Sequence, residues 1–157
     1  MESKQQVKLN YLKEQLAFAQ QASQVLKISV SRAVPVVKTL EKDIKASLTV
    51  EQEETLEALT ARFSRFADLL IQKLMRAIDA IELVDEGSII DRLARMEKRG
   101  LISDAKRWIE ARELRNTIAH EYTVENVRQL QVSALSFSQM ILSEFQKIEA
   151  HAIKCYH

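Results

Sequence analysis

The sequence predicts an all-α fold, an up-and-down bundle of four to five helices. Its 157 residues include two glycines and one proline, too few for a fold rich in strands and tight turns. Helix-forming residues, chiefly Leu, Ala, Glu, Lys, Gln and Arg, are abundant. Apolar residues recur at three- and four-residue steps over long stretches, which is the period of an amphipathic helix. These three observations favour helices joined by short connections.

The first predicted helix begins at Ser3 and ends near Lys27. Ser3 and Gln6 have the spacing of a capping box. The helix has one apolar stripe, made of Val7, Tyr11, Leu12, Leu16, Ala19, Ala22 and Leu26. The β-branched segment 28–34 interrupts the pattern, and Pro35 favours the start of a brief second helix that ends near Lys45.

The longest predicted helix begins at Thr49 and continues to about residue 84. A glutamine three positions after Thr49 repeats the capping-box spacing. At 1.5 Å per residue this helix would be ~50 Å long, so we expect it to be the spine of the bundle. Gly87 is expected to cap its C-terminal end, and Ser88 to begin a short helix that Gly100 ends.

Two further helices complete the predicted bundle. Ser103 is expected to cap a helix that ends near Tyr122, and Thr123 to cap a last long helix. No internal repeat, low-complexity run or flexible linker divides the chain. The sequence therefore predicts one helical domain spanning residues 1–157.

Charge and cysteine content limit the classes of function. A formal net charge of +1 gives no global attraction to nucleic acid or to a membrane surface, so any RNA binding would need a local patch. The single cysteine, Cys155, excludes an intrachain disulfide framework and a zinc site made of cysteines. No apolar segment has the length of a signal or membrane-spanning segment. We expect a cytoplasmic protein with no membrane association.

The segment 115–122, RNTIAHEY, contains most of the chemistry of the chain. It combines a permanent cation (Arg115), a group that titrates near neutral pH (His120) and a phenol (Tyr122). On a straight helix Arg115 and Tyr122 lie within ~20° of each other, and Asn116 and His120 form the adjacent row. Arg115 and His120 would be ~140° apart, with the long arginine reaching the mouth of a groove that His120 lines.

These residue types suit RNA cleavage. A base must take the proton of a 2′-hydroxyl, an acid must protonate the leaving 5′-oxygen, and a cation must stabilise the phosphate. His120 can do either of the first two tasks and Arg115 the third. One chain offers one such histidine, so a homodimer would assemble an acid–base pair. No carboxylate cluster or second histidine near the motif indicates a catalytic metal, since His151 and His157 are assigned to the C-terminal tail; we expect no metal and no cofactor.

Each of these residues also has a purely structural interpretation. Arg115 alone is typical of a surface ion pair, His120 of a residue at a helix end, and Tyr122 of a half-buried anchor. Residues 91–115 include eight basic and five acidic side chains, which indicate an RNA footprint or an ordinary solvated face. Trp108 is expected in the core or in a dimer interface rather than stacked on a base.

The string RN-x-x-A-H-x-Y resembles the hallmark motif of the HEPN superfamily, in which an arginine is followed by four to six residues and then a histidine. In this form it resembles the HEPN toxins encoded beside minimal nucleotidyltransferase antitoxins. In length and in the order of its helices, the resemblance covers most of the chain. The strict match to the motif covers only residues 115–122. It implies that Arg115 and His120 are the catalytic pair of a metal-independent endoribonuclease that cleaves RNA, with tRNA as one candidate. It also implies that Asn116 shapes the site and that a homodimer forms around a shared cleft.

The same resemblance implies a partner and a means of control. The nucleotidyltransferase antitoxin would transfer AMP from ATP to Tyr122, and the added charge and bulk would silence the enzyme. The segment 61–74 resembles a family helix with a polar residue toward the cleft, here Asp68 or Arg65, although both also fit solvated charges on the spine. Two other functions stay open: a non-catalytic HEPN-like substrate-binding or regulatory subunit of a nucleotidyltransferase, and a helical scaffold in which the motif is fortuitous.

Overall fold

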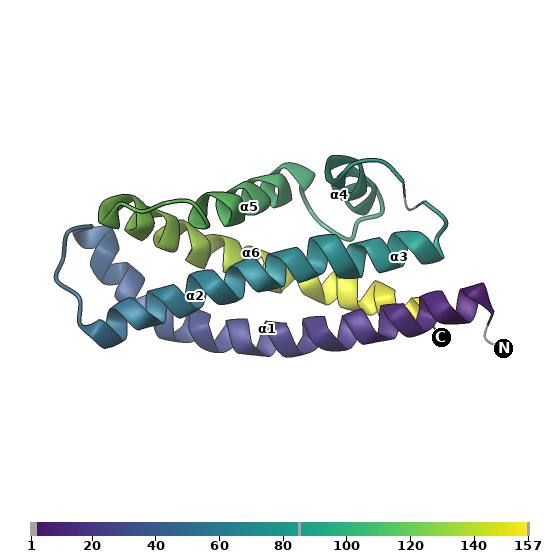
Figure 1. Cartoon of the computed structure of the whole chain (residues 1–157), viewed down its shortest axis with the longest axis horizontal. Coiled ribbons are helices and arrows are strands. Elements are labelled where there is room, and N and C mark those ends of the chain that lie inside the picture. The colour runs from purple at the N-terminus through teal and green to yellow at the C-terminus, as the bar shows by residue number, and fades with distance from the viewer. Residues whose placement is uncertain (1–2, 85, 157) are drawn as a thin grey trace.

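The computed structural model describes residues 3–84 and 86–156, which form five helical segments and no strand (Figure 1). The second segment continues without a break from α2 through the π-helical turn η1 into α3. The elements are α1 (Lys4–Lys42), α2 (Val50–Asp68), η1 (Leu69–Leu74), α3 (Met75–Ile81), α4 (Ile89–Lys98), α5 (Ala105–Ile118) and α6 (Val124–Cys155). The predicted all-α class is therefore confirmed.

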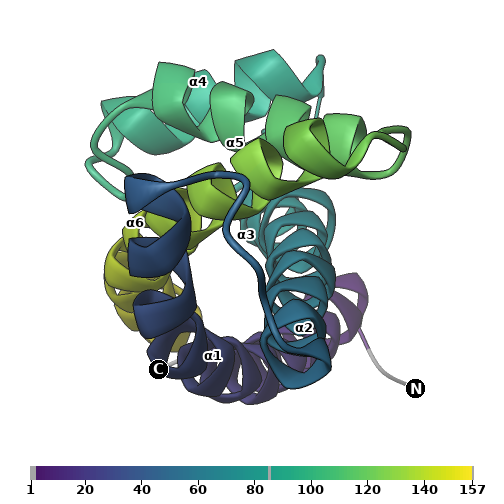
Figure 2. The same ribbon diagram turned by 90° about the vertical axis from the view of Figure 1, so that its left-hand side faces the viewer.

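Three long segments form the body of the bundle. Helix α1 packs against both the α2–η1–α3 segment and α6, and α2 also contacts α6. Helices α4 and α5 lie on the side of this body that is away from α1 (Figure 2). Both chain ends lie at the same end of the molecule, beside the end of α3 (Figure 1). The predicted spine, residues 49 to about 84, corresponds to α2–η1–α3.

Large apolar side chains fill the space between the three long segments and α5. Phe66 of α2 meets Phe145 of α6 edge to face, with ring centroids 5.4 Å apart. Trp108 of α5 is fully buried, as predicted, and its indole N–H donates to the Glu144 carboxylate. Glu144 Oε1 also accepts from the backbone N–H of Ser103 at 2.7 Å, which ties the start of α5 to α6.

The predicted break in the first helix is wrong. Helix α1 is continuous from Lys4 to Lys42 and contains Pro35 in its interior. Pro35 is exposed, while Val36, Val37 and Leu40 after it are buried. Burial of that apolar face outweighs the cost of a proline inside a helix, about 3 kcal/mol.

Most predicted helix starts are confirmed, and several ends differ. Ser3, Thr49 and Ser88 are N-caps whose side chains accept from the backbone N–H three residues on. Helix α5, however, is capped by Asp104 and not by Ser103, because the Asp104 carboxylate accepts from the Lys106 N–H at 2.9 Å.

The predicted cap at Gly87 is also wrong. Helix α3 ends at Ile81, and the left-handed position that closes it is Leu83, with φ 60°. The N–H groups of Val84 and Leu83 donate to the carbonyls of Asp79 and Ala80, which is the Schellman pattern. Gly87 lies instead before α4, where a Cβ would approach the Asp91 carboxylate to 2.5 Å.

Within residues 3–84 and 86–156, no helix combines the length and the apolar character required to cross a lipid bilayer.

Candidate active site

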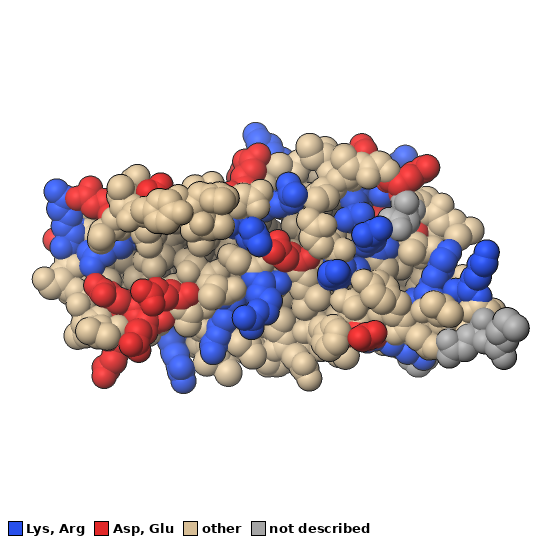
Figure 3. Space-filling view, viewed as in Figure 1, with Lys and Arg blue, Asp and Glu red and all other residues tan. Residues whose placement is uncertain are grey.

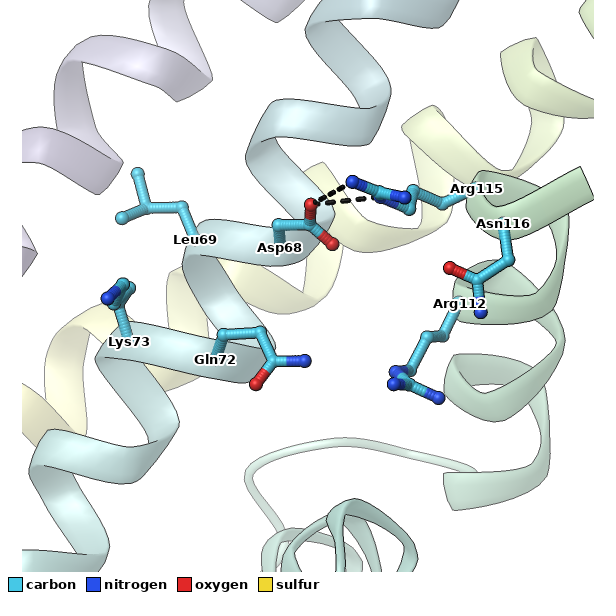
Figure 4. Close-up of a pocket in the computed structure, with 7 residues that line it drawn as sticks. All are labelled: Asp68, Leu69, Gln72, Lys73, Arg112, Arg115 and Asn116. Carbon is cyan, nitrogen blue, oxygen red and sulfur yellow. Dashed lines mark hydrogen bonds and ion pairs between the residues drawn. The ribbon is translucent and has the colours of Figure 1, made fainter. Parts of the chain in front are cut away.

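A pocket of about 610 Å³ lies between α5 and the α2–η1 segment (Figure 4). It contains polar and charged side chains from both walls. The lining residues are Asp68, Leu69, Gln72, Lys73, Arg112, Arg115 and Asn116. A cavity of this volume is of the size that holds a small ligand or a nucleotide.

Arg115 and Asp68 form a hydrogen-bonded ion pair across this pocket. Arg115 Nε donates to Asp68 Oδ2 at 2.9 Å, and Arg115 Nη2 lies 2.9 Å from the same oxygen (Figure 4). The two side chains are 35% and 40% exposed, so the pair is accessible from solvent. The guanidinium is therefore fixed in direction but keeps donors for an anion.

The wall opposite Arg115 contains the π-helical turn η1. Leu69, Gln72 and Lys73 of this turn line the pocket, while Leu70, Ile71 and Leu74 are buried. Arg92 Nη1 of α4 donates to the Ile71 carbonyl of this turn at 3.0 Å. Single π-helical turns inside α-helices occur frequently at functional sites.

The pocket has an excess of positive charge. Its lining residues include three cations, Lys73, Arg112 and Arg115, and one carboxylate, that of Asp68. Figure 3 shows Lys and Arg side chains along the middle of this face, between α2–α3 and α5, and acidic side chains near the end where α2 begins. Glu51 and Glu53 lie in the first turn of α2. The pocket therefore suits an anionic ligand such as a phosphodiester.

His120 does not line this pocket. Helix α5 ends at Ile118, and His120 lies in the turn that follows, where its N–H donates to the Thr117 carbonyl at 3.0 Å. Its imidazole is exposed and forms no hydrogen bond with any residue that the structure describes. The predicted straight helix through residue 122 is wrong, since α5 ends four residues earlier.

Tyr122 lies in the connection to α6 and is 87% exposed. It contributes to a different, smaller groove, together with Leu48, Leu56 and Val127. Because α5 ends before it, Tyr122 does not share a helix face with Arg115. The predicted alignment of these two side chains is therefore wrong.

Glu121 fixes the backbone around Tyr122. Its Oε1 accepts from the N–H groups of Tyr122 and Thr123 at 3.0 and 3.1 Å and from the Thr123 hydroxyl at 3.1 Å. The two backbone donors hold the pKa of the Glu121 carboxyl below its ordinary value. Thr123 occupies the N-cap position of α6, as predicted, but its hydroxyl is used on Glu121 and makes no cap bond.

The remaining predicted site residues divide between two grooves. Asp68 and Asn116 line the pocket with Arg115. Arg65 lines a neighbouring groove between α1 and α2, which also contains Phe18. Of the two polar candidates on the spine, Asp68 therefore faces Arg115 and Arg65 faces α1.

Three arginines of the basic segment 91–115 point inward. Asp79, fully buried in the last turn of α3, has Arg95 Nη2 at 2.9 Å, Arg99 Nη2 at 3.4 Å and Arg92 Nε at 3.6 Å. These cations join α4 to α3. They belong neither to an RNA footprint nor to a solvated face, the two interpretations that the sequence left open.

Gln72, Lys73 and Arg112 were missed as pocket residues. Gln72 is four positions after Asp68, and Arg112 is three before Arg115, so helical spacing puts each on the face of a predicted site residue. That spacing could have identified these two. Lys73 is five positions after Asp68, about 140° round an α-helix, and it lies in the π-helical turn η1. Comparison with protein-family models, with curated proteins and with solved structures finds no match to this chain.

Proposed function

We propose that this chain is a metal-independent endoribonuclease of the HEPN type that acts as a homodimer in the cytoplasm. One observation supports this most directly: Arg115, oriented by Asp68, faces a cationic pocket of about 610 Å³. His120, whose imidazole nitrogens can donate or accept a proton, follows five residues later on an exposed turn.

The proposed reaction is an internal transfer at phosphorus. The 2′-oxygen of RNA loses its proton to a base and attacks the adjacent phosphorus, and the 5′-oxygen leaves with a proton from an acid. The products are a 2′,3′-cyclic phosphate and a 5′-hydroxyl. Arg115 would stabilise the charge on the phosphate oxygens, and His120 would act as the base or the acid. Lys73 and Arg112 would bind flanking phosphates.

A second copy of the chain would complete the acid–base pair. His120 is exposed and lies outside the lining of the pocket, so a histidine from a facing copy could approach bound RNA from the open side. Dimerisation thus supplies the second proton-transfer group that one chain lacks.

Tyr122 is the proposed control point of a toxin–antitoxin pair. A partner nucleotidyltransferase would join the Tyr122 oxygen to the α-phosphorus of ATP, with release of pyrophosphate and of the phenolic proton. The phenol is 87% exposed, which suits modification by another protein. The attached AMP would oppose RNA binding by its charge and by its bulk.

Growth and RNA integrity test the proposal. The chain is induced alone in cells, beside Arg115→Ala and His120→Ala variants at equal protein levels. We expect the wild type to arrest growth and degrade RNA, and both variants to be harmless, since each removes a group required in the transition state. Purified protein in chelator should cleave RNA and leave cyclic phosphate ends.

Lys106→Ala is the matched control. It removes one positive charge from an exposed position of α5 that is outside the pocket, and it should remain toxic. Cleavage that persists in His120→Ala, or that requires an added metal, would contradict the proposed mechanism.

A non-catalytic, substrate-binding or regulatory subunit of a nucleotidyltransferase is the second candidate. It is favoured by the separation of Arg115 from His120 and Tyr122, because the pocket that Arg115 lines contains neither of the other two. Equal harmlessness of the wild type and both variants, with RNA binding retained, would favour this function over catalysis.

A further inference from the structure

Three side chains with metal-binding atoms meet where α3 and α6 end. They are Glu82, the C-cap residue of α3, and His151 and Cys155 in the last turns of α6. One ligand atom from each lies within 4.8 Å of the other two, and all three residues are partly buried. None of them contributes to the pocket that Arg115 lines.

The backbone holds these groups in place. His151 and Cys155 are four residues apart on α6 and so project from the same face of the helix. Glu82 is held in the Schellman turn, where its own N–H donates to the Ile78 carbonyl at 3.1 Å. Segments distant in sequence are thus fixed against each other with their ligand atoms converging. The sequence analysis assigned His151 to the C-terminal tail, but the residue lies inside α6.

We propose that Glu82, His151 and Cys155 bind a zinc ion, with water in the fourth position. Thiolate, imidazole and carboxylate are all ligands that zinc accepts, at about 2.0–2.3 Å. Ligand atoms of a tetrahedral site at those bond lengths are roughly 3.3–3.8 Å apart, so small side-chain movements suffice. Calcium and magnesium are disfavoured, because they prefer oxygen ligands throughout.

Arg99 would act as the outer partner of the carboxylate ligand. His151 Nε2 lies 2.5 Å from Glu82 Oε1, while Arg99 Nη1 lies 2.5 Å from Glu82 Oε2. Arg99 is itself held by the buried Asp79. Arg99 therefore fixes one oxygen of the Glu82 carboxylate. The other oxygen points at His151, and a metal ion could take the place of the proton between that oxygen and the imidazole nitrogen.

The charge of the occupied site is compatible with this neighbour. One thiolate and one carboxylate neutralise the formal charge of Zn²⁺, so Arg99 would not face a net cation. The single Cys155 excludes only zinc sites that are built from several cysteines. A mixed site with one cysteine needs only the single thiol that the chain has.

Bound zinc would connect the end of α6 to the turn after α3. Because the three ligands come together only in the folded chain, the metal should bind that state selectively and raise the melting temperature with increasing zinc concentration. This site is independent of RNA cleavage, and its test uses no RNA.

The experiment is titration of the full chain, first freed of metal by a chelator, with zinc chloride alone and with cobalt chloride alone. Native mass spectrometry should show one zinc per chain. Cobalt should give tetrahedral d–d bands and a thiolate-to-metal charge-transfer band. Cys155→Ser should abolish the charge-transfer band, and Glu82→Gln and His151→Gln should each weaken zinc binding by about tenfold or more.

Glu86→Gln is the matched control. It removes an exposed carboxylate that is four residues after Glu82 and is not one of the three ligands, and zinc affinity should be unchanged. Far-UV circular dichroism checks that each variant keeps its helix content. The proposal is overturned if wild-type protein binds cobalt without a charge-transfer band. It is also overturned if zinc affinity is the same in Cys155→Ser, Glu82→Gln and the wild type. Where a variant fails to fold, the spectrum of the wild-type protein decides.

Discussion

Arg115 directs two of its nitrogens, Nε and Nη2, at a single oxygen of Asp68, each at 2.9 Å. The second oxygen of Asp68 is left for other partners, and the remaining guanidinium N–H groups can bind an anion. The pair therefore positions Arg115 without using all of its hydrogen-bonding capacity. In the proposed enzyme, Asp68 is a positioning residue and Arg115 the group that contacts the phosphate.

Asp68→Ala should slow RNA cleavage strongly but lower the free energy of unfolding only slightly. Loss of the carboxylate leaves Arg115 free to rotate away, and misplacement of such a group costs about 10- to 100-fold in rate. The free energy of unfolding should fall by less than about 1 kcal/mol, because the ion pair is more than a third exposed. Single-turnover cleavage and urea denaturation measure the two quantities.

Glu54→Ala provides the comparison on the same helix. Its side chain is exposed and lies outside the pocket, so both rate and stability should match the wild type. A normal cleavage rate in Asp68→Ala would show that Arg115 needs no positioning by this carboxylate.

Asp79→Asn should destabilise the chain by about 3–5 kcal/mol, far more than the change at Asp68. Asp79 is fully buried and faces the buried Arg92 and the partly buried Arg95 and Arg99, so removal of its charge leaves this group of cations without its central carboxylate. Urea denaturation followed by circular dichroism measures the loss. A difference of under 1 kcal/mol between the two aspartate variants would mean that solvent reaches the cluster.

Leu83→Gly should stabilise the chain by about 0.5–1 kcal/mol. Leu83 has φ 60°, a conformation that costs an L-residue with a side chain about 1–2 kcal/mol and costs glycine little. Because the side chain is 77% exposed, little packing is lost with it. The gain is partly offset by the larger entropy of glycine in the unfolded chain.

Gly100→Ala is the reciprocal change at the equivalent position after α4. Gly100 has φ 75°, and an added Cβ would meet no atom within 4 Å, so the expected loss of about 1 kcal/mol is purely conformational. Thermal and urea unfolding of both variants without added metal test the pair. Equal stability of Leu83→Gly and wild type would contradict strain at Leu83.

Glu144→Ala should cost about 2–4 kcal/mol. The carboxylate is buried and accepts from the Trp108 indole and from the Ser103 N–H, so truncation leaves two donors without this acceptor. Glu149 lies five residues later on α6 and accepts one solvent-exposed hydrogen bond, from the Gln20 side chain. Glu149→Ala should therefore lower the free energy of unfolding by under about 0.5 kcal/mol. Tryptophan fluorescence during urea unfolding reports both.

The sequence was sufficient for the fold class and for the helices whose start signals are local. The capping box at Thr49 and the caps at Ser3 and Ser88 lie within three residues of the groups they satisfy. Pro35 misled the prediction, because its local cost is outweighed by burial of the apolar residues after it against other helices. Packing against other helices cannot be read from the sequence of a single helix.

The site was predictable only in part for the same reason. Arg115 and Asn116 could be read from the motif, and Asp68 from the spine, but their pocket depends on the π-helical turn η1, which has no signal in the sequence. The end of α5 at Ile118 was missed as well. Glu121 binds the N–H groups of Tyr122 and Thr123, which stabilises a turn where the apolar pattern predicted continued helix.

This turn should loosen in acid. The pKa of Glu121 is lowered in the folded chain by hydrogen bonds from the Thr123 and Tyr122 N–H groups. Those bonds therefore contribute fully above about pH 4.3, the ordinary glutamate pKa, and are lost as pH falls through the lower pKa of the folded state. Amide NMR shifts of Tyr122 and Thr123 should titrate with a midpoint below pH 4.3.

Glu121→Gln should remove that titration and leave the one at Ser88 intact. The pKa of Asp91 is likewise lowered, chiefly by the Ser88 N–H, so the Ser88 amide is an internal reference in the same spectra. If the Tyr122 and Thr123 amides still titrate in Glu121→Gln, another group controls the turn. If they do not, Glu121 fixes the backbone beside the phenol that we propose as the site of AMP transfer, and the variant should then be modified more slowly by the partner enzyme.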